Sequence, residues 1–336
     1  MDILLLLIGL ALILAGANFL TDGSAALAQR FHVPEFIIGL TIVAIGTSTP
    51  ELVVSVLSAL AGKSDVAIGN VVGSNIFNVF LILGICALIR PLPLTAGNIR
   101  RDIPFGVAAS LLLLFLAMDS WYSAGAVNRI GRLDGVLMLV IYVLLMLYTI
   151  RSTGRTAIPE PAAAGAATTA ATTGTAGTAD CDAAGRPMAG WLMALMIVGG
   201  LAGLIFGGEL FLDNATALAR RMGVSDSLIA ITLVAGGTSL PELASSVVSL
   251  VKGKSDMALG NVIGSNIANI LLILGLSASI HPLTMGGISV VDLLVVLLSS
   301  VLLFLTAFTF RRRAVDRWES VLFLVIYAAY IAYLIK

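Results

Sequence analysis

Long apolar stretches alternate with short polar ones along the whole chain. In the first half the apolar stretches occupy residues 2–20, about 35–61 with a polar interruption, 66–88, 104–118 and 134–150. In the second half they occupy about 191–212, 226–251, 257–279, 290–310 and 319–335. Most approach the roughly 20 residues that a helix needs to cross a bilayer. Because the period-two alternation of membrane strands is absent, the pattern predicts an all-α integral membrane protein with ten transmembrane helices.

Composition agrees with this interpretation. Hydrophobic residues make up 59% of the chain and charged residues 11%, whereas a soluble domain carries about one quarter charged residues. The first apolar stretch lacks a basic region and a cleavage site, so we expect a spanning helix and not a signal peptide. Cys86 and Cys181 have no metal-ligand spacing, and we expect no cofactor. The net charge of zero predicts no nucleic-acid partner, and no obligate protein partner is evident.

The two halves of the chain are copies of each other. The segment "VAIGNVVGSNIFNVFLILG" at 66–84 aligns without gaps with "MALGNVIGSNIANILLILG" at 257–275. The segment "GTSTPEL" at 46–52 aligns with "GTSLPEL" at 237–243. A single offset, 238 − 47 = 191 residues, relates the copies throughout this region. The pattern indicates a tandem duplication.

An odd number of spans in each copy makes the second copy enter the membrane from the opposite side. The sequence therefore predicts two inverted five-helix repeats, 1–150 and 188–336. Many secondary transporters share this plan, and their substrate site lies at the midplane between the repeats. Residues 151–187 consist mainly of Ala, Gly and Thr, a composition that cannot bury a core. We expect them to form a flexible linker.

The positions of Lys and Arg predict the orientation in the membrane. If the N-terminus lies outside, the inner loops hold Arg30, Arg90, Arg100, Arg101, Arg151, Arg155, Arg186, Lys252, Lys254, Arg311, Arg312, Arg313 and Arg317. The outer side then holds only Lys63, Arg129, Arg132, Arg220, Arg221 and Lys336. We therefore expect a multi-pass protein of the cell (inner) membrane, with both termini extracellular or periplasmic and a cytoplasmic linker.

Two glutamates carry the candidate chemistry. We expect Glu51 and Glu242 to be the only acidic residues deep inside apolar helices. A charge at the bilayer centre costs about 3 kcal/mol on insertion scales, so such residues normally line a cavity and have a partner. No Lys or Arg lies at comparable depth. The counter-charge is then a bound cation, a proton, or a proton that the two carboxylates share.

The neighbours of each glutamate favour the cation. Thr47 and Ser48 lie four and three residues before Glu51, on the same side of a helix, and the second copy repeats this spacing. Pro50 lacks a backbone N–H, which leaves carbonyl oxygens near Thr47 without helical partners. Carboxylate, hydroxyl and carbonyl oxygens suit a hard cation such as Na⁺ or Ca²⁺. The absence of a nearby His or Cys argues against zinc or copper.

A second polar pattern lies in the duplicated "GNV-x-GSN" helices. Ser74 and Asn78 lie one turn apart on one face, and the second copy repeats them. The glycines of these helices allow close approach to the helices with the glutamates. Small and polar residues are also common where helices simply pack, so both interpretations stay open. The sequence likewise leaves open whether the helix ends are capped or broken by Asn70, Asn75, Asn261 and Asn266.

At these residues the chain resembles the calcium/cation antiporter superfamily, specifically its prokaryotic sodium/calcium exchanger branch. The resemblance covers both halves and is carried by the repeated pattern "GTS-x-PEL … GNV-x-GSN-x-x-N". It implies ten transmembrane helices in two inverted repeats, with four cation sites between helices 2, 3, 7 and 8. It also implies alternating access in which helices 1 and 6 slide over the core.

The resemblance further implies which residues hold each ion. The central Ca²⁺ site would consist of Glu51, Glu242 and the carbonyls of Thr47 and Thr238. One flanking Na⁺ site would consist of Ser48, Ser74 and the Ala44 carbonyl. The symmetric site would consist of Ser239, Ser265 and the Ala235 carbonyl, and the middle would be completed by Asn78 and Asn269. Several relatives carry aspartate at the position of Asn269, so we expect exchange without K⁺.

Charge arithmetic predicts an electrogenic exchange. Two carboxylates balance one Ca²⁺, whereas three Na⁺ leave one excess positive charge that responds to the membrane potential. Carboxylates also bind protons, so an H⁺-coupled or broader divalent cation exchanger is an alternative. A cation channel or a non-transporting scaffold is a weaker one, because neither needs two equivalent half-sites. We expect no enzyme, because no His–Glu metal motif or Ser–His pair lies at membrane depth.

Overall fold

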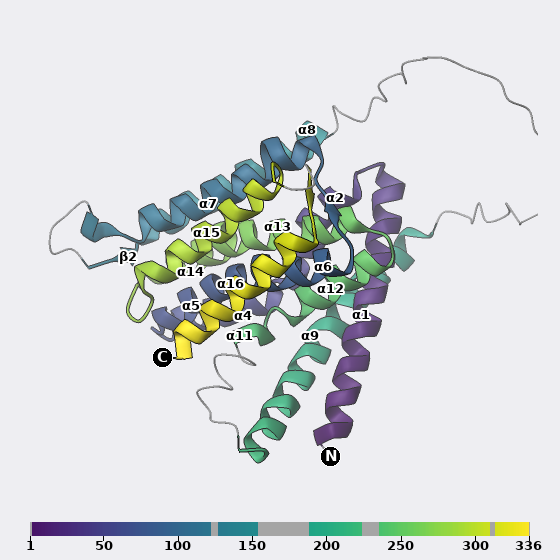
Figure 1. The fold of residues 1–336 in the computed structure, drawn as a ribbon, viewed down its shortest axis with the longest axis horizontal. Helices are drawn as coiled ribbons and strands as arrows, with labels where there is room; N and C mark the ends of the chain where they lie inside the picture. Colours follow the sequence, from purple (N-terminus) through teal and green to yellow (C-terminus); the bar gives the residue numbers. More distant parts are fainter. Residues whose placement is uncertain (1, 122–126, 154–187, 224–234, 310–312, 336) are drawn as a thin grey trace, which may run out of the picture.

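The computed structural model describes residues 2–121, 127–153, 188–223, 235–309 and 313–335. These residues are mostly helical (Figure 1). The α-helices of the first half are α1 (Asp2–Phe31), α2 (Glu35–Ile38), α3 (Ala44–Thr47), α4 (Thr49–Leu60), α5 (Ser64–Ile76), α6 (Gly84–Ile89), α7 (Ile103–Leu116) and α8 (Arg132–Thr153). Those of the second half are α9 (Gly190–Arg221), α11 (Ala235–Gly237), α12 (Leu240–Val251), α13 (Ser255–Ala268), α14 (Gly275–Ile280), α15 (Val290–Thr306) and α16 (Arg317–Ile335).

Short irregular elements connect these helices. The π-helical segments are η1 (Gly39–Val43), η2 (Phe77–Leu83), η3 (Asn98–Asp102) and η6 (Asn269–Leu274), and the 3₁₀ segment is η4 (Asp119–Trp121). Antiparallel pairs form between the two-residue strands β1 (Leu92–Pro93) and β4 (Ala314–Val315), and between β2 (Arg129–Ile130) and β3 (Leu283–Thr284). The all-α expectation therefore needs one addition, because each strand pair ties a loop of one half to a loop of the other.

Six helices of the described part are long and apolar enough to cross a membrane. They are 2–31, 64–89, 132–152, 190–221, 255–280 and 317–335. A seventh candidate is the pair 35–47 and 49–60, which is bent by 47°. The other predicted spans coincide with the shorter helices α7, α12 and α15. The predicted span at 226–251 and the linker at 151–187 both fall partly outside the described residues.

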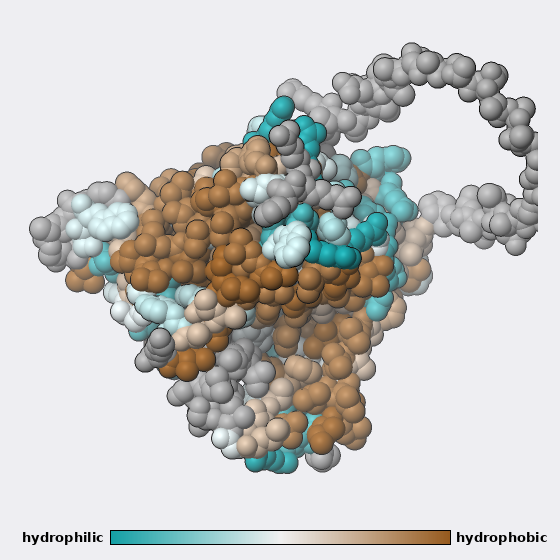
Figure 2. Space-filling model, in the orientation of Figure 1, coloured by the Kyte–Doolittle hydropathy of each residue, from teal (hydrophilic) through white to brown (hydrophobic). Residues whose placement is uncertain are grey.

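Two helices form the centre of the molecule. Within 64–89 and 255–280, 72% and 78% of the most apolar window is buried, against 17–28% in the other four long helices. Large apolar side chains cover the outer faces instead, among them Leu144 on α8 and Val325 on α16. Figure 2 shows this apolar surface extending over most of the visible helices. Such an exterior suits hydrocarbon, where an apolar side chain needs no cover.

The helices α1 and α9 form a closely packed pair at one side of the body (Figure 1). A Cβ atom at Gly16 would lie 2.7 Å from the carbonyl oxygen of Gly200, and one at Gly200 would lie 2.6 Å from the amide nitrogen of Leu20. Gly9 and Gly207 are the repeat equivalents of Gly200 and Gly16, and they make the same contact. A Cβ atom at Gly9 would lie 2.9 Å from the carbonyl oxygen of Gly207. The backbones of the two helices are therefore in direct contact at these glycines.

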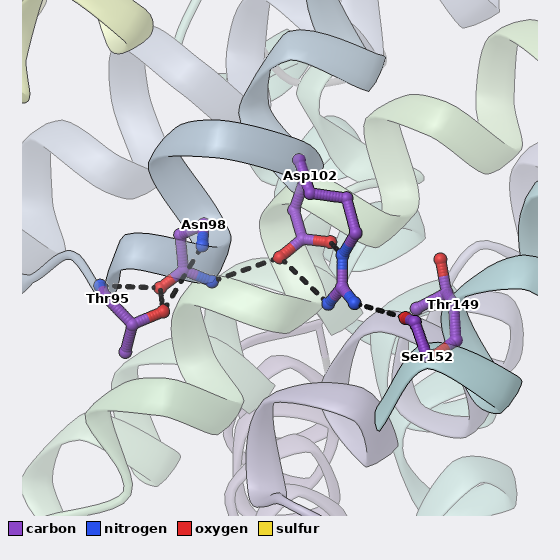
Figure 3. Close-up of polar contacts among 6 residues, drawn as sticks. Thr95, Asn98, Asp102, Thr149 and Ser152 are labelled. Carbon is purple, nitrogen blue, oxygen red and sulfur yellow. Dashed lines mark hydrogen bonds and ion pairs between the residues drawn. The ribbon is translucent and has the colours of Figure 1, made fainter. Parts of the chain in front are cut away.

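A polar cluster fastens the start of α7 to the end of α8 (Figure 3). The Arg101 guanidinium pairs with the buried Asp102 carboxylate at 2.7 Å and donates to Ser152 in the last turn of α8. Asn98 donates to Asp102 at 3.4 Å and accepts from the Thr95 amide at 2.8 Å. These contacts fix the helix end at which the predicted linker begins.

The glycine contacts predict a stability effect. Gly200→Ala should lower the free energy of unfolding by about 1–3 kcal/mol, because the added methyl meets the α1 backbone and the core cannot absorb it. The neighbouring Gly199→Ala is the matched control, since nothing lies within 4 Å of a Cβ there and alanine favours the helix. Thermal unfolding of both variants in detergent measures the difference. Equal melting temperatures would contradict close packing of α1 on α9.

Candidate cation site

The first "GTS-x-PEL" motif forms a break between two helices. α3 ends at Thr47 and α4 starts at Thr49, and Pro50 occupies the first turn of α4, where its missing N–H costs little. The Ser48 amide donates to the Ala44 carbonyl at 3.0 Å. The Leu52 amide donates to the Ser48 carbonyl at 3.0 Å. Because Pro50 has no N–H, the Gly46 carbonyl lacks its usual helical donor four residues further on.

The second motif repeats the break with small differences. α11 ends at Gly237, and α12 starts at Leu240 with Pro241 in its first turn. The Leu243 amide donates to the Ser239 carbonyl at 3.1 Å, as the equivalent amide does in the first copy. Each break places a glutamate in the first turn of the helix that follows.

The two glutamates are held by serines of the opposite half. The Ser48 hydroxyl donates to Glu242 Oε1 at 2.8 Å, and the Ser239 hydroxyl donates to Glu51 Oε1 at 2.8 Å. Both glutamates have no exposed area. The Oε2 atom of each is buried without a hydrogen-bond partner, and neither forms an ion pair with the described part of the chain. Two buried, half-satisfied carboxylates are stable only with a bound cation, a proton or an aqueous path nearby.

The serines of the central helices lie beside the same carboxylates. Ser74 donates to Glu51 Oε1 at 3.4 Å. The equivalent Ser265 hydroxyl is buried without a partner. Ser48 and Ser74, which the sequence grouped in one flanking site, thus bond to different glutamates. Among the expected carbonyl donors, Ala44 is buried at the start of α3, and Ala235 begins α11.

Two asparagines that the sequence left open belong to this site. Thr47 donates to Asn261 Oδ1 at 3.2 Å, and Thr238 donates to Asn70 Oδ1 at 3.3 Å. Asn70 in turn donates to the backbone carbonyl of Glu51 at 3.2 Å. The amide side chains therefore hold the threonines and the glutamate backbone in place. Asn70 and Asn261 occupy equivalent positions in the two copies, and this equivalence was the sequence signal that could have assigned them to the site.

Four further asparagines form a chain of hydrogen bonds between the central helices. Asn78 donates to Asn266 Oδ1 at 3.0 Å, and Asn269 donates to Asn75 Oδ1 at 3.1 Å. The Oδ1 atoms of Asn78 and Asn269 are buried without partners. Both residues lie at the start of the π-helical segments η2 and η6, a helix form that is frequent at functional sites. The sequence analysis expected Asn78 and Asn269 at the site, and the structure adds Asn75 and Asn266, which bond to them.

The donor set suits a hard cation. No group of three or more His, Cys, Asp or Glu occurs in the described part of the chain. The oxygens beside the two helix breaks come instead from the two carboxylates, from the serine and threonine hydroxyls and from the asparagine amides. Ca²⁺ and Na⁺ prefer such oxygen ligands.

One expectation from the sequence is wrong. Glu51 and Glu242 are not the only acidic residues within apolar helices, because Glu209 lies inside α9 (Gly190–Arg221). At 1.5 Å per residue it lies roughly 18 Å from the helix end at Arg221. Its side chain is exposed and lines a cavity. Glu209 falls within a long hydrophobic run, where one acidic residue hardly lowers the mean hydropathy, so the hydropathy pattern did not reveal it.

A cavity of about 660 Å³ lies beside the site, between α4, α5, α9 and the start of α12. Its lining includes Asn70, Thr238 and Pro241, which adjoin the glutamates. On the equivalent face of the other half, α1 packs directly on α12. There the Thr21 and Ser249 hydroxyls lie 3.0 Å apart. The site is therefore approached from one side and covered on the other.

Comparisons with known proteins show which family the chain resembles. The family model described as "Sodium/calcium exchanger protein" matches residues 1–151 and 192–336. The sodium/calcium exchanger MaX1 of Methanosarcina acetivorans is 32% identical over 99% of this chain and 98% of its own. The putative antiporter CaxA of Alkalimonas amylolytica is 37% identical over 82% and 80%. A solved structure of the sodium-calcium exchanger NCX_Mj has a TM-score of 0.78 and 30% identity, with 98% of each chain covered.

Removal of either carboxylate charge should abolish cation binding. Glu51→Gln and Glu242→Gln each preserve shape but halve the negative charge, so we expect Ca²⁺ affinity to fall at least about a hundredfold. Isothermal titration calorimetry of the purified chain measures this. Glu319→Gln is the matched control, because Glu319 is also buried but already accepts from Thr309 and the Asp316 amide. Unchanged Ca²⁺ affinity in either glutamate variant would overturn the site assignment.

Proposed function

The chain belongs to the sodium/calcium exchanger family, and on this premise we propose that it exchanges Na⁺ for Ca²⁺ across the cell membrane by alternating access. The observation that supports this most directly is the pair Glu51 and Glu242. Both carboxylates are fully buried, each has an unpartnered oxygen, and neither forms an ion pair within the described residues. One Ca²⁺ balances their two charges.

Each ion has a distinct set of proposed ligands. Ca²⁺ binds at the centre to Glu51, Glu242 and the carbonyls of Thr47 and Thr238. Na⁺ binds on one flank to Ser48, Ser74 and the Ala44 carbonyl, and on the other to Ser239, Ser265 and the Ala235 carbonyl. Asn78 and Asn269 complete the middle. Because Ser48 and Ser239 now donate to carboxylates, their hydroxyls rotate on ion binding so that a lone pair faces the cation.

The proposed topology has ten transmembrane helices in two inverted repeats, 1–150 and 188–336. The hydrogen bonds from Ser48 to Glu242 and from Asn78 to Asn266 support it, because each has an equivalent in which the two halves are exchanged. The Lys and Arg bias supports termini outside the cell and a flexible cytoplasmic linker at 151–187. No protein partner or cofactor is part of this proposal.

Charge balance supports an electrogenic exchange that is independent of K⁺. Three Na⁺ on two carboxylates carry one net positive charge, whereas one Ca²⁺ carries none. Asn269 supplies an amide and no third charge, so no carboxylate is left to balance a K⁺ bound together with Ca²⁺. One charge moved through 100 mV corresponds to about 2.3 kcal/mol.

The packing of α1 on α9 supports the proposed motion. The glycine contacts bind these helices into one unit, while α1 meets α12 mainly through side chains such as Thr21 and Ser249. Sliding of the unit over the core would close the cavity beside α9 and open the equivalent passage beside α1. The ion site then faces each side of the membrane in turn.

Uptake of ⁴⁵Ca²⁺ into proteoliposomes tests the coupling. Vesicles loaded with Na⁺ should take up Ca²⁺, and those with only a pH gradient should not. Uptake driven by the pH gradient alone would support an H⁺-coupled exchanger, and uptake without any gradient would support a channel. A 100 mV inside-positive potential should raise accumulation roughly fiftyfold at equilibrium, because one net charge leaves in each cycle. Replacement of K⁺ by choline should change nothing at a fixed potential.

A disulfide between α1 and α12 tests the motion. Thr21→Cys with Ser249→Cys, in a chain without its native cysteines, should stop exchange on oxidation and recover it on reduction. Either single variant should exchange as before. Ca²⁺ binding should persist in the oxidised protein, because the cavity beside α9 stays open. Undiminished flux after complete cross-linking would contradict the sliding motion.

A further inference from the structure

Glu209 carries a negative charge but is not among the proposed ligands of the cation site. It lies on α9, and none of the described residues that line its cavity is a Lys or Arg. It forms no ion pair with the described part of the chain. An unpaired carboxylate within a membrane helix is costly and is normally retained for an ion pathway.

The cavity connects Glu209 to the cation site. Its lining includes Thr238, whose hydroxyl donates to Asn70 at 3.3 Å, and Asn70 donates to the Glu51 carbonyl at 3.2 Å. An ion in this cavity therefore has Glu209 on one wall and the polar edge of the site on the other. A cavity with apolar walls and one sign of charge concentrates the opposite ion.

The first half of the chain has no carboxylate at the position equivalent to Glu209. The position equivalent to Glu209 is 209 − 191 = 18, and it holds Asn18. Asn18 donates to the Leu14 carbonyl at 2.7 Å, within its own helix. The passage beside α9 thus carries a carboxylate where the passage beside α1 carries an amide.

We propose that Glu209 forms a cation-recruiting subsite in the passage beside α9, which attracts Ca²⁺ and Na⁺ before they reach Glu51 and Glu242. The proposal rests on the exchange activity proposed above and adds a difference between the two sides. Ions approaching through this passage are captured faster than ions approaching from the side of α1. The protein therefore has a lower KM for Ca²⁺ on the side of α9.

Glu209→Gln tests the subsite by sided transport. At low ionic strength the variant should show at least about a threefold higher KM for Ca²⁺ on the side of α9, with kcat and the KM on the opposite side unchanged. Added choline chloride should raise the KM of the unaltered protein and hardly affect the variant, because salt screens the charge. Glu209→Asp should restore the low KM. The matched variant Asn18→Asp should lower KM on the opposite side instead.

Initial ⁴⁵Ca²⁺ exchange in right-side-out and inverted vesicles gives these values. An unchanged KM in Glu209→Gln, or an equal change from both sides, would overturn the proposal. If the unaltered protein exchanges no Ca²⁺, the proposed function fails, and stopped-flow Ca²⁺ binding to the purified full chain still tests the subsite. The association rate constant should fall at least about threefold in Glu209→Gln. An unchanged rate constant, or no Ca²⁺ binding at all, would overturn the proposal.

Discussion

The cost of a negative charge in hydrocarbon shapes the centre of this protein. Glu51 and Glu242 are fully buried, and neither has a basic partner in the described part of the chain. Hydrogen bonds from serines satisfy one oxygen of each carboxylate and leave the other unpartnered. Such a pair is stable only with a positive ion, a proton or an aqueous path nearby. The broken helices, the polar central helices and the adjoining cavity all serve this requirement.

Neither half of the chain can meet that requirement alone. Ser48 of the first half bonds to Glu242 of the second, and Ser239 bonds to Glu51 in return. The hydrogen bonds among the four asparagines cross the boundary in the same way. Duplication therefore supplies more than a second copy of a site, because each copy completes the polar shell of the other. A change in the relative position of the halves would alter both shells at once.

The sequence predicted the helical class from hydropathy, and the constant offset showed which residues of the two halves are equivalent. It grouped Ser48 with Ser74, whereas the structure bonds them to different glutamates. An offset shows which residues are equivalent, not which ones touch, so contacts between the halves could not be predicted. Helices α7 and α15 are shorter than the spans predicted at 104–118 and 290–310. Glu209 was overlooked because one carboxylate hardly changes the hydropathy of a long apolar run.

Some contacts of one half have no equivalent in the other, and these contacts stabilise the two sides of the protein unequally. Asp22 on α1 pairs with Lys252, directly after α12, at 2.7 Å. The equivalent positions hold Asp213 and Ala61, so the second half has no counterpart of this ion pair. An exposed pair of this kind is worth up to about 1 kcal/mol, which shifts a two-state equilibrium about fivefold. In the proposed exchange cycle, this ion pair and the hydroxyl contact between Thr21 and Ser249 favour closure beside α1 over closure beside α9. A duplicated chain whose halves were identical would favour neither state, so side preference has to come from positions where the copies differ.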